Sequence, residues 1–167
     1  MHLTKMRICC FYNDLIGNWS EIKKVKTLVI DSLILTKLYR KRKFLKKIFE
    51  WTGYNVMELL YKGSRDGSTS KDFHDRCDNK GPTICLYKND KNYIFGGYAS
   101  ISWTSKDGYH SASGSFIFTL TNIHETEPIK FSKFSNKNRD KRVYHDPDLG
   151  PYFGDYNDID IRSDYKN

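Results

Sequence analysis

The chain has 167 residues, of which 38% are hydrophobic, 15% aromatic and 29% charged. This length suits one domain with a sizeable core, and the plentiful aromatic residues exclude a wholly disordered chain. The net charge of +8 is unevenly distributed, because seven basic residues and no acid lie between Lys37 and Lys47, whereas six aspartates and one arginine lie between Asp146 and Asp164. The excess charge favours an acidic partner near the N-terminal third.

Cysteine usage and the lack of a targeting segment indicate the compartment. The four cysteines are Cys9, Cys10, Cys77 and Cys85. The neighbours Cys9 and Cys10 are poorly placed to bridge each other. The N-terminus lacks the long apolar region of a secretory signal, and the most apolar stretch, residues 28–35, contains Asp31 and is too short to span a bilayer. We therefore expect a cytoplasmic protein with free thiols.

The first half of the chain predicts helices around one strand. Residues 1–30 show no firm period and predict a poorly structured lead-in to a domain over residues 31–167. Apolar residues recur at helical spacing over 31–50, and Gly53 fits just beyond the end of that helix. The apolar run 56–62 predicts a buried strand, and residues 69–77 predict a short capped helix.

The second half predicts strands separated by polar turns. Strands are expected over 83–88, 93–103 and 115–120, with a polar loop over 106–114. The pair Gly96 and Gly97 within the second of these strands predicts a bulge or a close backbone approach. Weaker alternating patterns follow at 129–134, 141–145 and 158–161.

Several short motifs, at residues 60–67, 72–74, 77–83, 94–98 and 102–103, occur in one order along the chain. Together they are similar to the signature of the TLDc domain family, and the resemblance extends from about Leu33 to Ile161. Any single motif is weak, but the ordered set is specific. The candidate family-motif or binding residues are Ser64, Arg65, Asp66, Gly67, Phe73, His74, Cys77, Asp78, Gly81, Pro82, Gly96, Gly97, Tyr98 and Trp103.

The resemblance implies an α+β fold, an antiparallel two-sheet β-sandwich flanked by short helices. Family members usually continue past the last recognisable segment with strands that close the sandwich, so we expect this fold to be C-terminally incomplete. The resemblance also implies a protein–protein interaction module, without catalytic residues or a cofactor. It links the chain to the oxidative stress response and to binding of the vacuolar proton pump (V-ATPase).

The charged turn between Gly63 and Gly67 has two interpretations. Arg65 is suited to recognise a carboxylate or phosphate on a partner. Alternatively, Arg65 and Asp66 pair locally or cap the helix that opens near Thr69. Turn chemistry favours the second, structural interpretation.

His74, Cys77, Asp78 and Cys85 raise three chemical hypotheses. His74 and Cys77 have plausible zinc-ligand spacing, but a structural zinc site normally needs a second close pair. Their spacing on a helix also allows a hydrolase-like nucleophile pair, and an exposed cysteine of low pKa would allow thiol-redox chemistry. We favour a structural interpretation, in which Cys77 packs in the core and His74 bonds a loop carbonyl.

The basic run from Lys37 to Lys47 is a candidate binder of an anionic membrane surface, whereas nucleic acid is disfavoured. The alternative, which we favour, is a solvated helix face whose other side is buried. The aspartate-rich tail lacks the glycine and glutamate of a calcium loop. The leading hypothesis is therefore a non-enzymatic interaction module, with an enzyme using His74 and Cys77, or a basic-helix binder, as alternatives.

Overall fold

The computed structural model describes residues 5–10, 35–132, 141–154 and 158–159. The helices are α2 (Leu35–Thr52), α3 (Gly63–Asp66) and α4 (Ser70–Cys77). The strands are β1 (Lys5–Cys10), β2 (Val56–Lys62), β3 (Thr83–Lys88), β4 (Ile94–Ala99), β5 (Gly108–Ser111), β6 (Phe116–Thr119), β7 (Ile129–Phe131), β8 (Lys141–His145) and β9 (Tyr152–Phe153).

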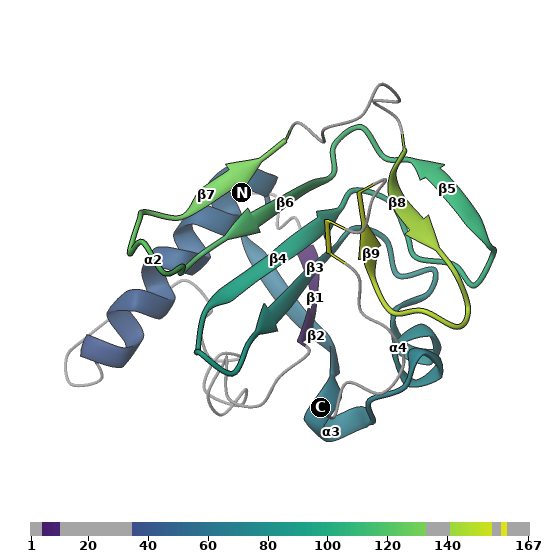
Figure 1. Cartoon of the computed structure of the whole chain (residues 1–167), viewed down its shortest axis with the longest axis horizontal. Coiled ribbons are helices and arrows are strands. Elements are labelled where there is room, and N and C mark those ends of the chain that lie inside the picture. Colours follow the sequence, from purple (N-terminus) through teal and green to yellow (C-terminus); the bar gives the residue numbers. More distant parts are fainter. Residues whose placement is uncertain (1–4, 11–34, 133–140, 155–157, 160–167) are drawn as a thin grey trace.

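These strands form two sheets, as Figure 1 shows. The larger sheet has the strand order β2-β1-β3-β4-β6-β7, and the smaller one has the order β5-β8-β9. Pairing is antiparallel from β3 through β7 and throughout the small sheet, whereas β1 runs parallel to both of its neighbours. The α+β two-sheet fold expected from the sequence is confirmed. In the large sheet β1 lies between β2 and β3, so these two strands are not adjacent, and they run parallel to each other.

Strand β1 corrects the expectation of a poorly structured lead-in for residues 5–10. It lies between β2 and β3, with Ile8 opposite both Leu59 and Ile84. Met6 and Ile8 are fully buried on one face of the sheet, and Cys9 is fully buried on the other. A central strand covered on both faces has no simple apolar–polar alternation, and six residues are too few to reveal it by period.

Further differences concern short elements. The polar loop predicted over 106–114 contains β5, which pairs with β8 because its backbone completes the small sheet. β4 is shorter than predicted, and Tyr152–Phe153 forms a strand that no alternation indicated. Of the pattern at 129–134, residues 129–131 form β7, while 133–134 lie outside the described residues. In the pattern at 158–161, Ile159 forms a bridge with Phe153, whereas residues 160–161 lie outside the described residues.

The two faces of the large sheet bury different elements. One face packs against α2, through a cluster that includes Ile48, Ile84 and Phe118. The other face packs against α4 and the small sheet. Figure 1 shows α2 and the small sheet at opposite ends of the view, with the large sheet running between them.

The glycine pair of β4 permits close packing against this sheet. A Cβ added at Gly96 would lie 2.1 Å from the carbonyl oxygen of Cys85, and one at Gly97 would lie 2.5 Å from the ring of Phe153. Neither separation is tolerable for a real Cβ atom. The close approach predicted for this pair is therefore confirmed, because Phe153 of the small sheet lies directly on Gly97.

Candidate functional site

The two charged residues of α3, Arg65 and Asp66, bond to each other. The side chain of Asp66 is 3% exposed, and it accepts hydrogen bonds from Arg65 Nε at 2.7 Å and from the Lys62 amide at 2.9 Å. Arg76 of α4 lies 3.3 Å from the same carboxylate. Burial raises the pKa of Asp66, but the bonds from Arg65 and Lys62 outweigh it and hold the pKa below its ordinary value. The structural interpretation of this turn is confirmed, while Ser64 remains exposed on it.

The turn of α3 is followed by α4, whose first residues are capped by side-chain hydrogen bonds. Gly67 ends α3, and its carbonyl accepts a hydrogen bond of 2.8 Å from the Tyr61 hydroxyl. Thr69 then caps α4: its side chain accepts from the Asp72 amide, and the Asp72 carboxylate accepts from the Thr69 amide. This reciprocal capping box fixes where α4 starts and hence where its buried face points.

The buried face of α4 carries aromatic packing. Phe73 is fully buried, with its ring edge-on to Tyr61 at 5.8 Å and to Trp103 at 5.7 Å between centroids. Trp103 in turn meets Phe153 of β9 edge-on at 5.5 Å. Such edge-to-face pairs stabilise a core beyond simple burial. Phe73 and Trp103 therefore join α4, the large sheet and the small sheet.

His74 and Asp78 form a buried polar joint beside this aromatic packing. His74 Nδ1 lies 2.7 Å from Asp78 Oδ1, and His74 Nε2 lies 2.9 Å from the Asp146 carbonyl and 3.0 Å from the Leu149 carbonyl. Ser105 donates to the other Asp78 oxygen at 2.7 Å. Both ring nitrogens of His74 are therefore engaged, Nδ1 by a side chain and Nε2 by two loop carbonyls. The predicted bond from His74 to a loop carbonyl is confirmed.

This geometry differs from that of a nucleophile pair. Ser105 contacts the carboxylate and not the imidazole, and both ring nitrogens of His74 are engaged. Cys77 is fully buried, and its sulfur lies 2.8 Å from the sulfur of Cys9. A general base must have a nitrogen free to take the proton of the nucleophile. The arrangement therefore serves to hold loops in place.

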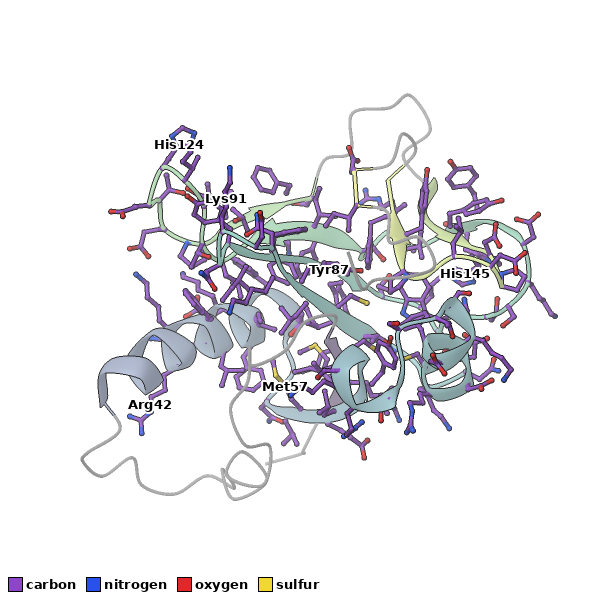
Figure 2. The ribbon with its side chains drawn as sticks, turned by 60° about the horizontal axis from the view of Figure 1, so that its bottom comes forward. Arg42, Met57, Tyr87, Lys91, His124 and His145 are labelled. Atoms are coloured by element: carbon purple, nitrogen blue, oxygen red, sulfur yellow. The ribbon has the colours of Figure 1, made fainter. Side chains whose placement is uncertain are left out.

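Two stacked histidines, His110 and His145, lie near the same joint, and no sequence motif indicated them. His145 of β8 is 1% exposed, stacks on His110 of β5 at 4.0 Å between centroids and contacts Trp103 at 5.3 Å. Its Nδ1 bonds to Thr104 at 2.9 Å. Figure 2 shows His145 inside the fold, beside the strands of the small sheet. Burial and, secondly, His110 lower the pKa of His145 to about 4, so this histidine is neutral at pH 7.

The remaining signature residues shape the start of β3 and the middle of β4. The Gly81 amide donates to Ser102 at 2.9 Å, and Pro82 leads directly into β3. Tyr98 is buried against Phe116 on the α2 face, where burial raises the pKa of its phenol. Gly81, Pro82 and Tyr98 thus position strands of the large sheet.

Lysines in the described part of the basic run pair with acids of this chain. Lys43 lies 2.6 Å from Glu127, and Lys47 lies 2.9 Å from Glu50. Arg42 projects away from the body of the fold in Figure 2. The side chains of residues 35–41 lie outside the description. Binding of an anionic membrane by this run stays a prediction.

Across the described residues, no three or more His, Cys, Asp or Glu side chains are grouped so that they could hold a metal ion. No helix in the same residues is both long enough and apolar enough to cross a membrane.

The fold and the joint define a two-sheet α+β domain in which Phe73, His74 and Trp103 of the ordered motifs pack between α4, the large sheet and the small sheet. The profile of the TLDc domain family matches residues 26–167, and the chain belongs to this family. It is also similar to the MTOR-associated protein MEAK7 of Danio rerio, 34% identical over 62 residues, and to that of Gallus gallus, 31% identical over 62 residues. Each match covers 37% of this chain, but only 14% and 13% of the respective relative.

Proposed function

We propose that this chain is a non-enzymatic interaction module of the TLDc type that docks on a protein partner in the cytoplasm. The observation that carries the proposal is that signature side chains make their contacts inside the fold. His74, Asp78 and Trp103 are engaged with one another's elements inside the fold, where they fix loops and sheets. Such a scaffold holds a surface of defined shape for a partner.

The surface that we propose for docking lies at β7, the last strand of the large sheet. Of the four large hydrophobic side chains that are exposed in the described residues, three lie on β7 or in the turn before it: Ile123, Ile129 and Phe131. We call these three the β7 edge patch. An edge strand with exposed apolar side chains fits an extended segment of a partner that pairs with it as an added strand.

The contacts around the β7 edge patch hold the strand in place. β7 pairs with β6, and its inward residue Lys130 lies 4.2 Å above the ring of Phe116. Lys43 of α2 reaches Glu127, which lies two residues before the start of β7. A strand anchored in this way is ready to receive a partner without ordering first.

The partner that we propose is the vacuolar proton pump, with resistance to oxidative stress as the biological outcome. The TLDc resemblance supports this partner at the level of the family. The MEAK7 relatives are named as MTOR-associated, and the 62-residue segment shared with them supports a common module.

The test measures binding of the full chain to purified vacuolar proton pump. We expect saturable binding that weakens at least tenfold when Ile129→Lys and Phe131→Glu are combined. Tyr109→Lys, which places a charge at the exposed aromatic of the small sheet, is the matched control and should bind as the unmodified chain does. Failure of the unmodified chain to bind contradicts the pump as partner. Equal binding by the double variant contradicts the β7 edge patch.

A further inference from the structure

Three cysteines from three separate elements meet inside the fold. Cys9 comes from β1, Cys77 is the last residue of α4, and Cys85 lies on β3 directly beside Cys9 in the parallel register. All three side chains are fully buried and belong to one core cluster. None of them takes part in the joint formed by His74 and Asp78, so that joint does not account for the convergence.

Two of these thiols are positioned for a bond. The sulfurs of Cys9 and Cys77 lie 2.8 Å apart, and a disulfide joins its sulfurs at about 2.05 Å. Closing that gap needs only a small movement of either side chain. We propose that Cys9 and Cys77 form a dithiol pair that a hydroperoxide oxidises to a disulfide, which fastens β1 to α4.

The reaction consumes one hydroperoxide for each disulfide. The thiolate of one cysteine attacks a peroxide oxygen, the O–O bond breaks, and the products are a sulfenic acid and, with hydrogen peroxide, water. The second thiolate then attacks the sulfenic sulfur, the S–O bond breaks, the S–S bond forms, and a second water leaves. The two cysteines are oxidised by two electrons, and the peroxide is reduced by two.

Burial sets the rate of this reaction. It raises the pKa of Cys9 well above the usual value, with the hydrogen bond to Cys77 adding to the effect, and it raises the pKa of Cys85. Because the thiolate is the reacting species, the closed fold keeps the pair reduced under mild conditions. Oxidation proceeds when β1 opens locally or the pH rises, and the disulfide then holds β1 in the sheet.

The position of the pair gives the bond a structural consequence. Cys9 and Cys77 are 68 residues apart, so the disulfide closes a long loop. β1 lies before residues 26–167, which match the TLDc family, whereas α4 lies within them. Oxidation would therefore fasten a central strand from outside the matched segment to a helix inside it. A cross-link over a loop of this length stabilises mainly by restricting the unfolded chain.

The test treats the reduced full chain with hydrogen peroxide at pH 8, blocks remaining thiols after unfolding, and maps cysteines by peptide mass spectrometry. We expect a Cys9–Cys77 linkage, a blocked Cys85 and a melting temperature raised by roughly 10 °C, reversed by reductant. Cys85→Ala should retain the shift, and Cys9→Ala should lose it. If either variant does not fold, the linkage map of the unmodified chain decides alone. A bond to Cys85, or over-oxidised thiols without an internal bond, overturns the proposal.

Discussion

The two faces of the large sheet are built from different kinds of side chain. The face toward α2 buries apolar and aromatic groups such as Ile48, Met6 and Phe118. The face toward α4 and the small sheet buries aromatic groups too, but also thiols, and His74 and His145 border it. An apolar face depends on area and shape alone, whereas a face with buried polar groups depends on proton positions and bond geometry.

This difference affects which substitutions each face tolerates. The α2 face tolerates exchange among apolar residues of similar volume. On the α4 face, His74 and Asp78 each bond to a particular polar partner, and losing one is costly because it leaves a buried polar group unsatisfied. His74, Asp78 and Trp103, which belong to the ordered motifs, all lie on that side. Substitutions on the two faces should therefore change the free energy of unfolding by different amounts.

The largest expected effect is a clash at Gly97. Gly97→Val places side-chain atoms against the buried ring of Phe153, so we expect roughly 3 kcal/mol or more of destabilisation in denaturant unfolding. On the α2 face, Ile84→Val should cost only about 1 kcal/mol. If the ring causes the effect, Phe153→Ala combined with Gly97→Val will cost less than the sum of the two single changes. Additive costs would show that the sheets do not meet at this point.

A somewhat smaller effect is expected from pH. The unfolded chain protonates His145 near pH 6.5, whereas the folded site resists protonation down to about pH 4. The folding stability that His145 contributes is complete above pH 6.5 and is lost as the pH falls towards 4, by about 3 kcal/mol. The groups that influence this ring are His110 of β5, His74 of α4 and Asp78, which directly follows α4.

Urea unfolding between pH 7 and pH 4 measures this loss. His145→Gln should be less stable at pH 7 but should show a flatter profile through the same window. Asp66, whose pKa is lowered, loses its stabilising contribution only below its ordinary range near pH 4, so it does not produce the same slope. An unchanged slope in His145→Gln would locate the pH dependence elsewhere.

The smallest effect is expected at the surface of α2. The pair of Lys43 and Glu127 is exposed, with side-chain exposures of 40% and 72%. Lys43→Gln should therefore change the free energy of unfolding by less than about 1 kcal/mol, and added salt should remove most of the difference. A larger and salt-independent loss would mean that Lys43 holds β7 by packing of its aliphatic chain.

The sequence predicted the parts of this fold that carry local signals. The apolar run of β2, the capping box of α4 and the close approach at Gly97 were all recognisable, because each is marked by a pattern of adjacent residues, even though the ring that meets Gly97 belongs to the distant Phe153. β1 was missed because its partners are distant in the sequence, and β9 because its two residues are too few to show an alternation. β5 was missed because the polar residues of 106–114 resemble a loop until β8 pairs with them.

The contacts of the joint formed by His74 and Asp78 were also only partly predictable from the sequence. His74 was assigned a loop carbonyl correctly, because a histidine on a short buried helix needs a partner. Its actual acceptors, the carbonyls of Asp146 and Leu149, are more than 70 residues away, and no spacing indicates them. His145 and Cys9 carried no motif, so only the tertiary fold reveals that they border His110 and Cys77.

The central claim is that the signature residues hold the fold together from inside, and the ring protons of His74 test it most directly. In a ¹⁵N-labelled full chain, NMR should detect a slowly exchanging ring N–H proton on His74, because both ring nitrogens bond inside the fold, to the Asp78 carboxylate and to the loop carbonyls. Asp78→Asn, which weakens the bond that orients the ring, should speed that exchange. Rapid exchange in the unmodified chain would show an accessible imidazole and would contradict the account.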